Sequence, residues 1–213
     1  MKKLIGIIGT ITLCYVMFFS INYFGEPQYN NLVSERLKLA DSPEELIEES
    51  DLIVLAKVLP DKNNILVNSS DGQFVLFGYT ETKLQIEKVF KGGGTIDDNI
   101  IITEEYYTTL AQSGTQTVWT NGNYLPAEVG ETYLFFLKGY GDTERYKGMF
   151  YPIDLEYGKY VIPDEELSFF ADEAVKGSID EKADIAEKFE IRPGENISTY
   201  VQWYDVLSKE FLQ

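Results

Sequence analysis

The sequence predicts a mainly β protein with some α-helix: a small barrel of about five to six strands, then helices, behind one apolar N-terminal helix. Three observations predict this. An uncharged segment follows two N-terminal lysines, strand-length apolar or alternating runs fill the middle of the chain, and helical periodicity begins near residue 163. The expected regions are a transmembrane signal-anchor at 1–24, a stalk at 25–41, the β-barrel domain at 42–162, and a helical C-terminal subdomain packed on the barrel at 163–213.

The N-terminal segment has the features of a membrane anchor. Lys2 and Lys3 precede an uncharged run from Leu4 to Phe24. As a helix this run would be roughly 31 Å long, about the thickness of a bilayer core. The lysines favour a cytoplasmic N-terminus, so we expect a single-pass protein of the cell membrane whose domain lies outside the cytoplasm.

Two alternatives to an uncleaved anchor keep the domain outside the cytoplasm. A cleaved signal peptide would secrete it, although the nearest small-residue site, Ser20-Ile21-Asn22, ends in an unfavourable asparagine. Lipidation at Cys14 would need a small residue immediately before the cysteine, where Leu13 stands. All three readings give the segment the same role, which is to deliver one domain across a membrane.

Charge and composition exclude several classes of function. The formal net charge is -17, and the first 24 residues contain no acid, so the excess of acids lies entirely in the following domain. Such a domain repels nucleic-acid phosphate. The chain has no histidine, and Cys14 is its only cysteine, so the soluble part lacks the usual ligands for zinc, copper or haem and the base of a His-dependent hydrolase. We expect no metal, no cofactor and no disulfide.

A short helix is expected at the start of the domain. Ser42-Pro43-Glu44-Glu45 combines an N-cap, a first-turn proline and a capping-box glutamate, and the helix should end near Ser50. The strands expected after it are, in chain order, 52–58, 65–68, 74–90, 99–104, 131–138, 146–151 and 158–162.

Three features of these strands carry further expectations. Leu52–Val58 is apolar except for Lys57, which should face outward, and Pro60 should end that strand. In 74–90 the even positions are mostly apolar or Thr, which predicts one inward face. Gly78 interrupts that face and indicates a bulge or a sharp bend.

Helical periodicity follows Pro163. Gly177 should end one helix, and a second capping box at Ser178–Glu181 should begin another. The last helix has one apolar stripe, whose members are Ile197, Tyr200, Val201, Tyr204, Leu207 and Phe211.

Three segments carry a resemblance to known proteins: Glu49–Val54 (ESDLIV), Lys88–Gly92 (KVFKG) and Val129–Leu137 (VGETYLFFL). They resemble a pattern in Gram-positive exported proteins of unknown function. The block from residue 49 to about 162 also looks like the OB-type barrel of tissue-inhibitor-of-metalloproteinase and netrin modules. The resemblance implies an OB-like fold. It does not imply the inhibitory mechanism, which depends on an N-terminal cysteine and on disulfides that this domain lacks.

The candidate ligand-binding residues are aromatic. Tyr106, Tyr107, Trp119 and Tyr124 fall in a long polar loop, residues 105–128, which joins two strands and could hold a short strand around Val118. Loops in this position border the ligand face of OB-type barrels, and exposed Tyr and Trp suit a protein or a glycan. The alternative is that these rings cover the end of the barrel. The acidic pairs and triplets along the chain are interpreted as caps and solvated surface, with calcium as the metal that such oxygen ligands would suit.

Three functions are compatible with these features. The first is non-enzymatic binding, with another protein of the cell envelope as the expected partner. The second is an envelope hydrolase that uses carboxylates, which requires two or three polar groups converging in a deep pocket. The third is an accessory subunit of a membrane protein, for which the apolar stripe of the last helix would be the docking face.

Overall fold

The computed structural model describes residues 28–32, 40–93, 97–111, 114–122, 124–141, 143–162 and 197–212. In this part of the chain no helix is both long enough and apolar enough to cross a membrane. The anchor expected at 1–24 and the helices expected between 163 and 196 lie outside the described residues.

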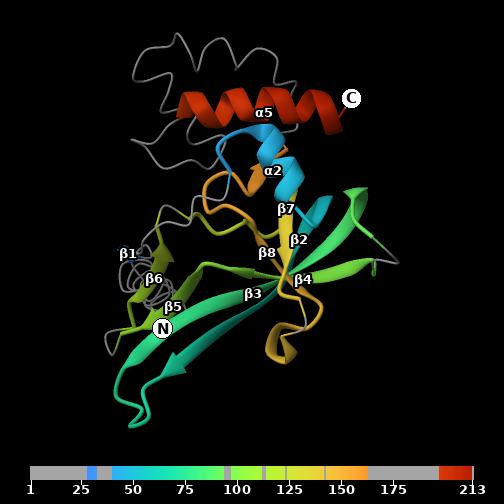
Figure 1. Cartoon of the computed structure of the whole chain (residues 1–213). Coiled ribbons are helices and arrows are strands. Elements are labelled where there is room, and N and C mark those ends of the chain that lie inside the picture. Colours follow the sequence, from blue (N-terminus) through green and yellow to red (C-terminus); the bar gives the residue numbers. More distant parts are fainter. Residues whose placement is uncertain are drawn as a thin grey trace, which may run out of the picture.

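The described chain is mainly β, with two α-helices (Figure 1). Its elements, in chain order, are β1 (Gln28–Leu32), α2 (Pro43–Glu49), β2 (Leu52–Asn68), β3 (Val75–Lys91), β4 (Asn99–Glu104), β5 (Tyr106–Leu110), β6 (Gln116–Asn121), β7 (Thr132–Gly139), the 3-10 helix η1 (Glu144–Tyr146), β8 (Met149–Pro152), β9 (Lys159–Val161) and α5 (Ile197–Phe211).

The larger sheet is partly closed. Its six strands follow the order β2-β3-β4-β8-β7-β9, and β2 also pairs with β7. All of these pairs are antiparallel except that of β4 with β8. The mainly β character and the strand number agree with the predicted small barrel of five to six strands, but the sheet is only partly closed and does not form a regular barrel.

The expectation that Pro60 ends the first long strand is wrong. β2 continues through Pro60 to Asn68, and its register against β3 shifts between Val58 and Lys62. The bulge accommodates the proline. Residues inside a bulge are not hydrogen-bonded to the partner strand, so the N–H group that Pro60 lacks is not needed there. Lys57 is exposed, as expected.

The main core lies between the closed part of the larger sheet and the two helices. β7 is buried over five successive residues, Tyr133–Leu137. The stripe of α5 packs into the same core, where Val201 and Leu207 are 2% and 0% exposed. α2 and α5 lie together at one end of the molecule, opposite the turn between β2 and β3 (Figure 1). The Ser42 hydroxyl caps α2 by accepting a hydrogen bond from the Glu45 amide, as predicted.

A second, smaller sheet replaces most of the expected long loop. β5 and β6 form an antiparallel hairpin, and β1 pairs with β6 in parallel. The sequence predicts only a short strand around Val118, because the region is polar and its alternation is weak. β1 lies within the segment expected to be a stalk.

Candidate binding groove and the buried network beside it

The hairpin of β2 and β3 extends beyond the closed part of the sheet. β7 pairs with β2 only as far as Lys57, and β4 pairs with β3 only from Thr80 to Gln85. Among the described strands, the segments Ile65–Asn68 and Val75–Tyr79 therefore pair only with each other. The large apolar side chains exposed on or beside this extension are Leu66, Phe74, Leu76, Phe77 and Leu110.

A groove of about 570 Å³ lies between the extension and the β5–β6 hairpin. Four consecutive residues of β3, Val75–Gly78, form one wall. The residues of the other wall are Glu105, Tyr107, Thr109, Trp119 and Asn121. Leu76 is 64% exposed and Phe77 is 47% exposed, so solvent reaches apolar side chains along the rim.

The rings of Tyr107 and Trp119 both belong to this second wall. Their centroids are 6.2 Å apart and their planes differ by 13°, so the rings are stacked. The indole N–H of Trp119 donates a hydrogen bond of 2.8 Å to the Thr109 hydroxyl, which fixes the orientation of the indole. The structure thus brings two of the four predicted aromatic residues together in the lining of the groove, where Trp119 is half-buried and Tyr107 is 7% exposed.

The glycine at position 78 is required by a close approach, and of the bulge or sharp bend expected there, the bulge is absent. The register of β2 against β3 runs through Leu66 and Gly78 without a shift. A Cβ at Gly78 would lie 2.5 Å from Cγ of Tyr107 and 2.8 Å from the carbonyl oxygen of Ile65. The Tyr107 ring can therefore lie on the β3 backbone only because residue 78 has no side chain.

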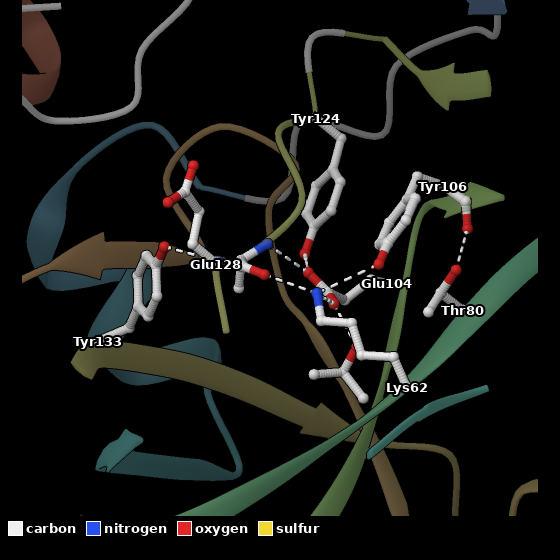
Figure 2. A network of polar contacts seen from close by, with 9 residues as sticks. Lys62, Thr80, Glu104, Tyr106, Tyr124, Glu128 and Tyr133 are labelled. Carbon is white, nitrogen blue, oxygen red and sulfur yellow. Dashed lines mark hydrogen bonds and ion pairs between the residues drawn. The ribbon is translucent and has the colours of Figure 1, made fainter. Parts of the chain in front are cut away.

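The other two predicted aromatic residues, Tyr106 and Tyr124, are also buried but belong to a polar network beside the groove (Figure 2). Tyr124 is 0% exposed and Tyr106 is 8% exposed. Tyr106 and Tyr107 are neighbours in β5, so their side chains leave the strand on opposite faces, one into the network and one into the groove. Tyr106 and Tyr124 therefore contribute to the site as structural support, through the buried network beside the groove.

Glu104 is the centre of this network. Its Oε1 accepts hydrogen bonds from the Tyr124 hydroxyl at 2.8 Å and the Ala127 amide at 2.7 Å. Its Oε2 accepts from Nζ of Lys62 at 3.1 Å and from the Thr82 hydroxyl. The Glu104 side chain is 0% exposed, so these four donors replace the water that the carboxylate would otherwise bind.

Lys62 is equally saturated. Besides Glu104, its ammonium donates to the Tyr106 hydroxyl at 3.1 Å and to the carbonyl of Ala127 at 2.6 Å. Burial by itself lowers the pKa of Lys62, but the nearby Glu104 carboxylate and Tyr106 hydroxyl outweigh it, and the pKa lies above its usual value. Burial, followed by the charge of Glu104, raises the pKa of Tyr124 well above its usual value.

This convergence of a lysine, a carboxylate and two tyrosines does not constitute an active site. Every donor of the Lys62 ammonium and both oxygens of Glu104 are engaged by the protein itself. A general acid or base must reach its substrate within hydrogen-bond distance, and here the protein occupies those positions. The chemistry of the network is therefore structural: it attaches the loop after β6 to β2 and β4.

The acidic residues singled out in the sequence are dispersed. Glu49 forms an ion pair with Lys138 at 2.9 Å, and Asp51 accepts a hydrogen bond from the Gly139 amide. Asp97 and Asp98 are exposed, and 164–166 lies outside the described residues. Within the described ranges, no group of three or more acids, cysteines or histidines is arranged to hold a metal ion.

The β3 wall of the groove was not predicted from the sequence. Phe74, Leu76 and Gly78 were assigned to an inward face that continues through Thr80 to Ile86, yet Phe74 and Leu76 are among the most exposed apolar residues. The available signal was that Phe74–Phe77 is apolar at successive positions, which an ordinary half-buried strand is not. The partial burial of Lys62 was not predicted either, because it depends on partners that are far away in the sequence.

No protein-family model matches the chain, and no curated protein matches it at a significant level.

Proposed function

We propose that this chain is a membrane-anchored extracytoplasmic binding protein, without enzymatic activity, whose ligand is another protein of the cell envelope. The groove between β3 and the β5–β6 hairpin is its binding site. The single observation that carries the proposal is the cluster of exposed Phe74, Leu76 and Phe77 beside the stacked Tyr107 and Trp119. Contiguous exposed apolar surface of this kind marks interaction sites in soluble domains.

The composition of the site favours a protein ligand. Tyr and Trp are the residues that most often dominate the energy of protein interfaces, because they offer large rigid surfaces with one polar group. Trp119 is held in place by the Thr109 hydroxyl, and Tyr107 by contact with the β3 backbone, so neither ring needs to be ordered on binding. The net charge of -17 disfavours nucleic acid.

The two alternative functions have less support. A carboxylate-dependent hydrolase would need free acidic groups in a pocket, whereas the most buried acid, Glu104, has all its hydrogen-bonding positions filled. An accessory subunit that docks through the last helix would need the α5 stripe free. Tyr200, Val201 and Leu207 of that stripe are instead buried in the main core.

We further propose that the partly closed sheet is an OB-like barrel, as the resemblance to tissue-inhibitor-of-metalloproteinase and netrin modules implies. The support is the ring formed by β2, β3, β4, β8 and β7, which returns to β2 through the β2–β7 pair. In OB-type barrels, ligands bind on the face bordered by strands 2 and 3 and the connecting loops. The groove lies along β3, which is the second strand of this ring.

Site-specific photo-cross-linking in native membranes tests the binding site. A photoreactive residue at Leu76 should yield a discrete cross-linked protein species, and Trp119→Ala should reduce its yield. Val206 is the matched control, because it is also an exposed apolar residue (45%) but lies on α5, away from the groove. Equal cross-linking from the two positions would count against the groove, and no cross-linking from either would count against a protein ligand.

Membrane attachment is tested separately. We expect the full chain to sediment with membranes and to be degraded by protease added outside the cytoplasmic compartment. Recovery of the intact protein in the cytosol would refute both the anchor and the extracytoplasmic location.

A further inference from the structure

We infer that the ligand binds as an added β-strand: an extended segment of the partner protein pairs with the free edge of β3 at Val75–Tyr79. This inference rests on the proposed function and specifies the mode of binding at the same groove. The occupant is a peptide segment because only a polypeptide backbone offers N–H and C=O groups at the spacing of a strand edge.

The edge is free because β4 leaves the sheet early. β4 pairs with β3 down to the pair Thr80–Glu104, and the chain then bends at Glu105. Had it continued straight, the next residues would lie beside Val75–Tyr79. They form β5 instead, which pairs with β6 in the smaller sheet. Within the described residues, this stretch of β3 has a strand partner on one side only, which is β2.

The turn of the chain at Glu105 is held by specific contacts. The Thr80 hydroxyl donates a hydrogen bond of 2.9 Å to the carbonyl of Tyr106, which ties the start of β5 to β3. The side chain of Asn64 makes two bonds to the backbone of Thr108, at 3.0 Å through its amide nitrogen and 2.7 Å through its oxygen. β5 is thus fixed across the hairpin by side chains, and none of the described strands other than β2 pairs with β3 at Val75–Tyr79.

The groove follows β3 along this stretch. Four consecutive residues, Val75–Gly78, line it, so the groove borders the β3 backbone as well as its side chains. Leu76 is also bulged out of the pairing with β2, since the register passes from Val67–Phe77 to Asn68–Val75. The bulged residue adds one more peptide group to the stretch of β3 that lines the groove.

The sequence of this edge carries neither a charge nor a proline, the residues that most often prevent strand pairing. Natural proteins protect open edges with lysine or proline, with inward-pointing charges, or with a covering segment. Between Phe74 and Tyr79 the sequence is FVLFGY, without a charge or a proline. An apolar strand edge of this kind would promote aggregation if it had no function, and its retention here is explained by a ligand strand.

The lining residues define the chemistry of the ligand. Tyr107 and Trp119 favour apolar side chains at alternate positions of the added strand, because every second residue would face the rings. Glu105 is the one charged residue among those lining the groove, and its carboxylate also accepts a hydrogen bond of 3.2 Å from Asn121. We therefore expect an extended segment with alternating apolar residues and a lysine or arginine that pairs with Glu105.

A pair of synthetic peptides tests the mode of binding. The probe is a short labelled peptide of alternating Val and Thr with one central Lys, and its control has the same sequence with N-methylated backbone amides. Fluorescence anisotropy with the full chain should show at least about tenfold weaker binding of the methylated peptide, the equivalent of losing one or two backbone hydrogen bonds. Equal binding of the two peptides would overturn strand addition while leaving the groove as a binding site.

Hydrogen exchange supplies an independent readout. Bound peptide should slow amide exchange in segment 75–79 and leave α5 unchanged. Glu105→Gln should weaken binding of the lysine peptide by roughly threefold to tenfold, in the range of one ion pair, and should not weaken a norleucine analogue. Protection of α5 in place of 75–79 would contradict the inference. A dimer of the chain alone that Leu76→Lys dissociates would also overturn it, because a second copy would then occupy the edge.

The outcomes separate the two proposals. If Leu76 cross-links to a protein but the peptides bind without regard to methylation, the proposed function stands and strand addition fails. If Leu76 and Val206 cross-link equally, both proposals fail.

Discussion

The ammonium of the partly buried Lys62 lies 3.1 Å from Oε2 of the fully buried Glu104, and this ion pair connects the long β2–β3 hairpin to β4. The same ammonium bonds the carbonyl of Ala127 at 2.6 Å, which extends the connection to the loop after β6. The pair lies directly beneath the wall of the groove, because Tyr106 bonds Lys62 while its neighbour Tyr107 lines the groove. The proposed binding surface is therefore supported by a polar network in which Lys62 and Glu104 have all their hydrogen-bonding positions filled.

Removing one partner of this pair should destabilise the protein strongly. Lys62→Met leaves the Glu104 carboxylate buried without a counter-charge, and we expect a loss of about 3–5 kcal/mol of unfolding free energy in urea denaturation. The matched control is Lys209→Ala on α5, which removes an exposed ion pair with Asp205 and should cost no more than about 0.5 kcal/mol. Similar losses from the two variants would contradict the structural role of the network. The double variant Lys62→Met with Glu104→Gln should recover part of the loss, since no buried charge remains.

Gly78 should tolerate no side chain. Gly78→Ala places a Cβ against the Tyr107 ring and the Ile65 carbonyl, and this overpacking should cost about 1–3 kcal/mol. Gly93→Ala is the control, because a Cβ there meets nothing within 4 Å, and it should change stability by less than about 0.5 kcal/mol. Thermal and urea unfolding measure both variants. A neutral Gly78→Ala would mean that Tyr107 is free to move off the β3 backbone, and the rigid wall described for the groove would be wrong.

Asn64 should hold β5 against the hairpin. Asn64→Ala removes both hydrogen bonds to the backbone of Thr108, and we expect amide exchange at Thr108 to accelerate by about tenfold, as for a loss of roughly 1.4 kcal/mol. Asn63→Ala is the neighbouring control and removes only one exposed bond, to Glu81. If Thr108 exchanges equally in the two variants, the Asn64 side chain does not determine the position of β5.

Stability should fall at alkaline pH. Burial raises the pKa of Tyr140 to about 12, from an ordinary value of 10.0. A folded-state pKa above the unfolded value means that folding favours the neutral phenol. The contribution is therefore fully present below pH 10.0 and is lost as the pH rises from there toward about 12. Burial, and to a lesser extent the charge of Glu104, also raises the pKa of Tyr106 and of Tyr124, so their contributions to stability are lost in the same direction.

Urea unfolding at a series of pH values measures this effect. We expect unfolding free energy to be steady up to about pH 9 and to decline above pH 10. Tyr140→Phe, which cannot ionise at this position, should show a shallower decline than the wild-type chain. A profile that stays flat to about pH 12 in the wild type would contradict the burial of these phenols.

The elements that could be predicted are those whose sequence signal lies within a few neighbouring residues. The α2 start follows from Ser42 and Glu45, which contact each other within one turn. β7 follows from a wholly apolar run, and the buried stripe of α5 follows from helical periodicity. The closure of the sheet through the β2–β7 pair could not be read from the sequence in the same way, because it joins segments about 80 residues apart that carry no complementary pattern.

The candidate site was predictable only in part. An aromatic-rich stretch indicated Tyr107 and Trp119, and the structure brings these rings together at the groove. The same signal selected Tyr106 and Tyr124, which the structure buries around Glu104. Composition identifies aromatic side chains that must pack against something. Whether that is the protein itself or the groove depends on the face of β5 from which each side chain leaves, which only the tertiary structure decides.

By itself, the sequence determined the mainly β character of the domain, its acidic charge, the lack of His and Cys chemistry outside Cys14, and the periodicity of its elements, because each depends on residue type and short spacing. Only the tertiary structure decided that Lys62 and Glu104 meet, that Gly78 underlies Tyr107, and that β4 ends early enough to leave the β3 edge open. These are relations between residues distant in the chain. They are set by how strands pair and where the chain bends, and strand pairing is non-local.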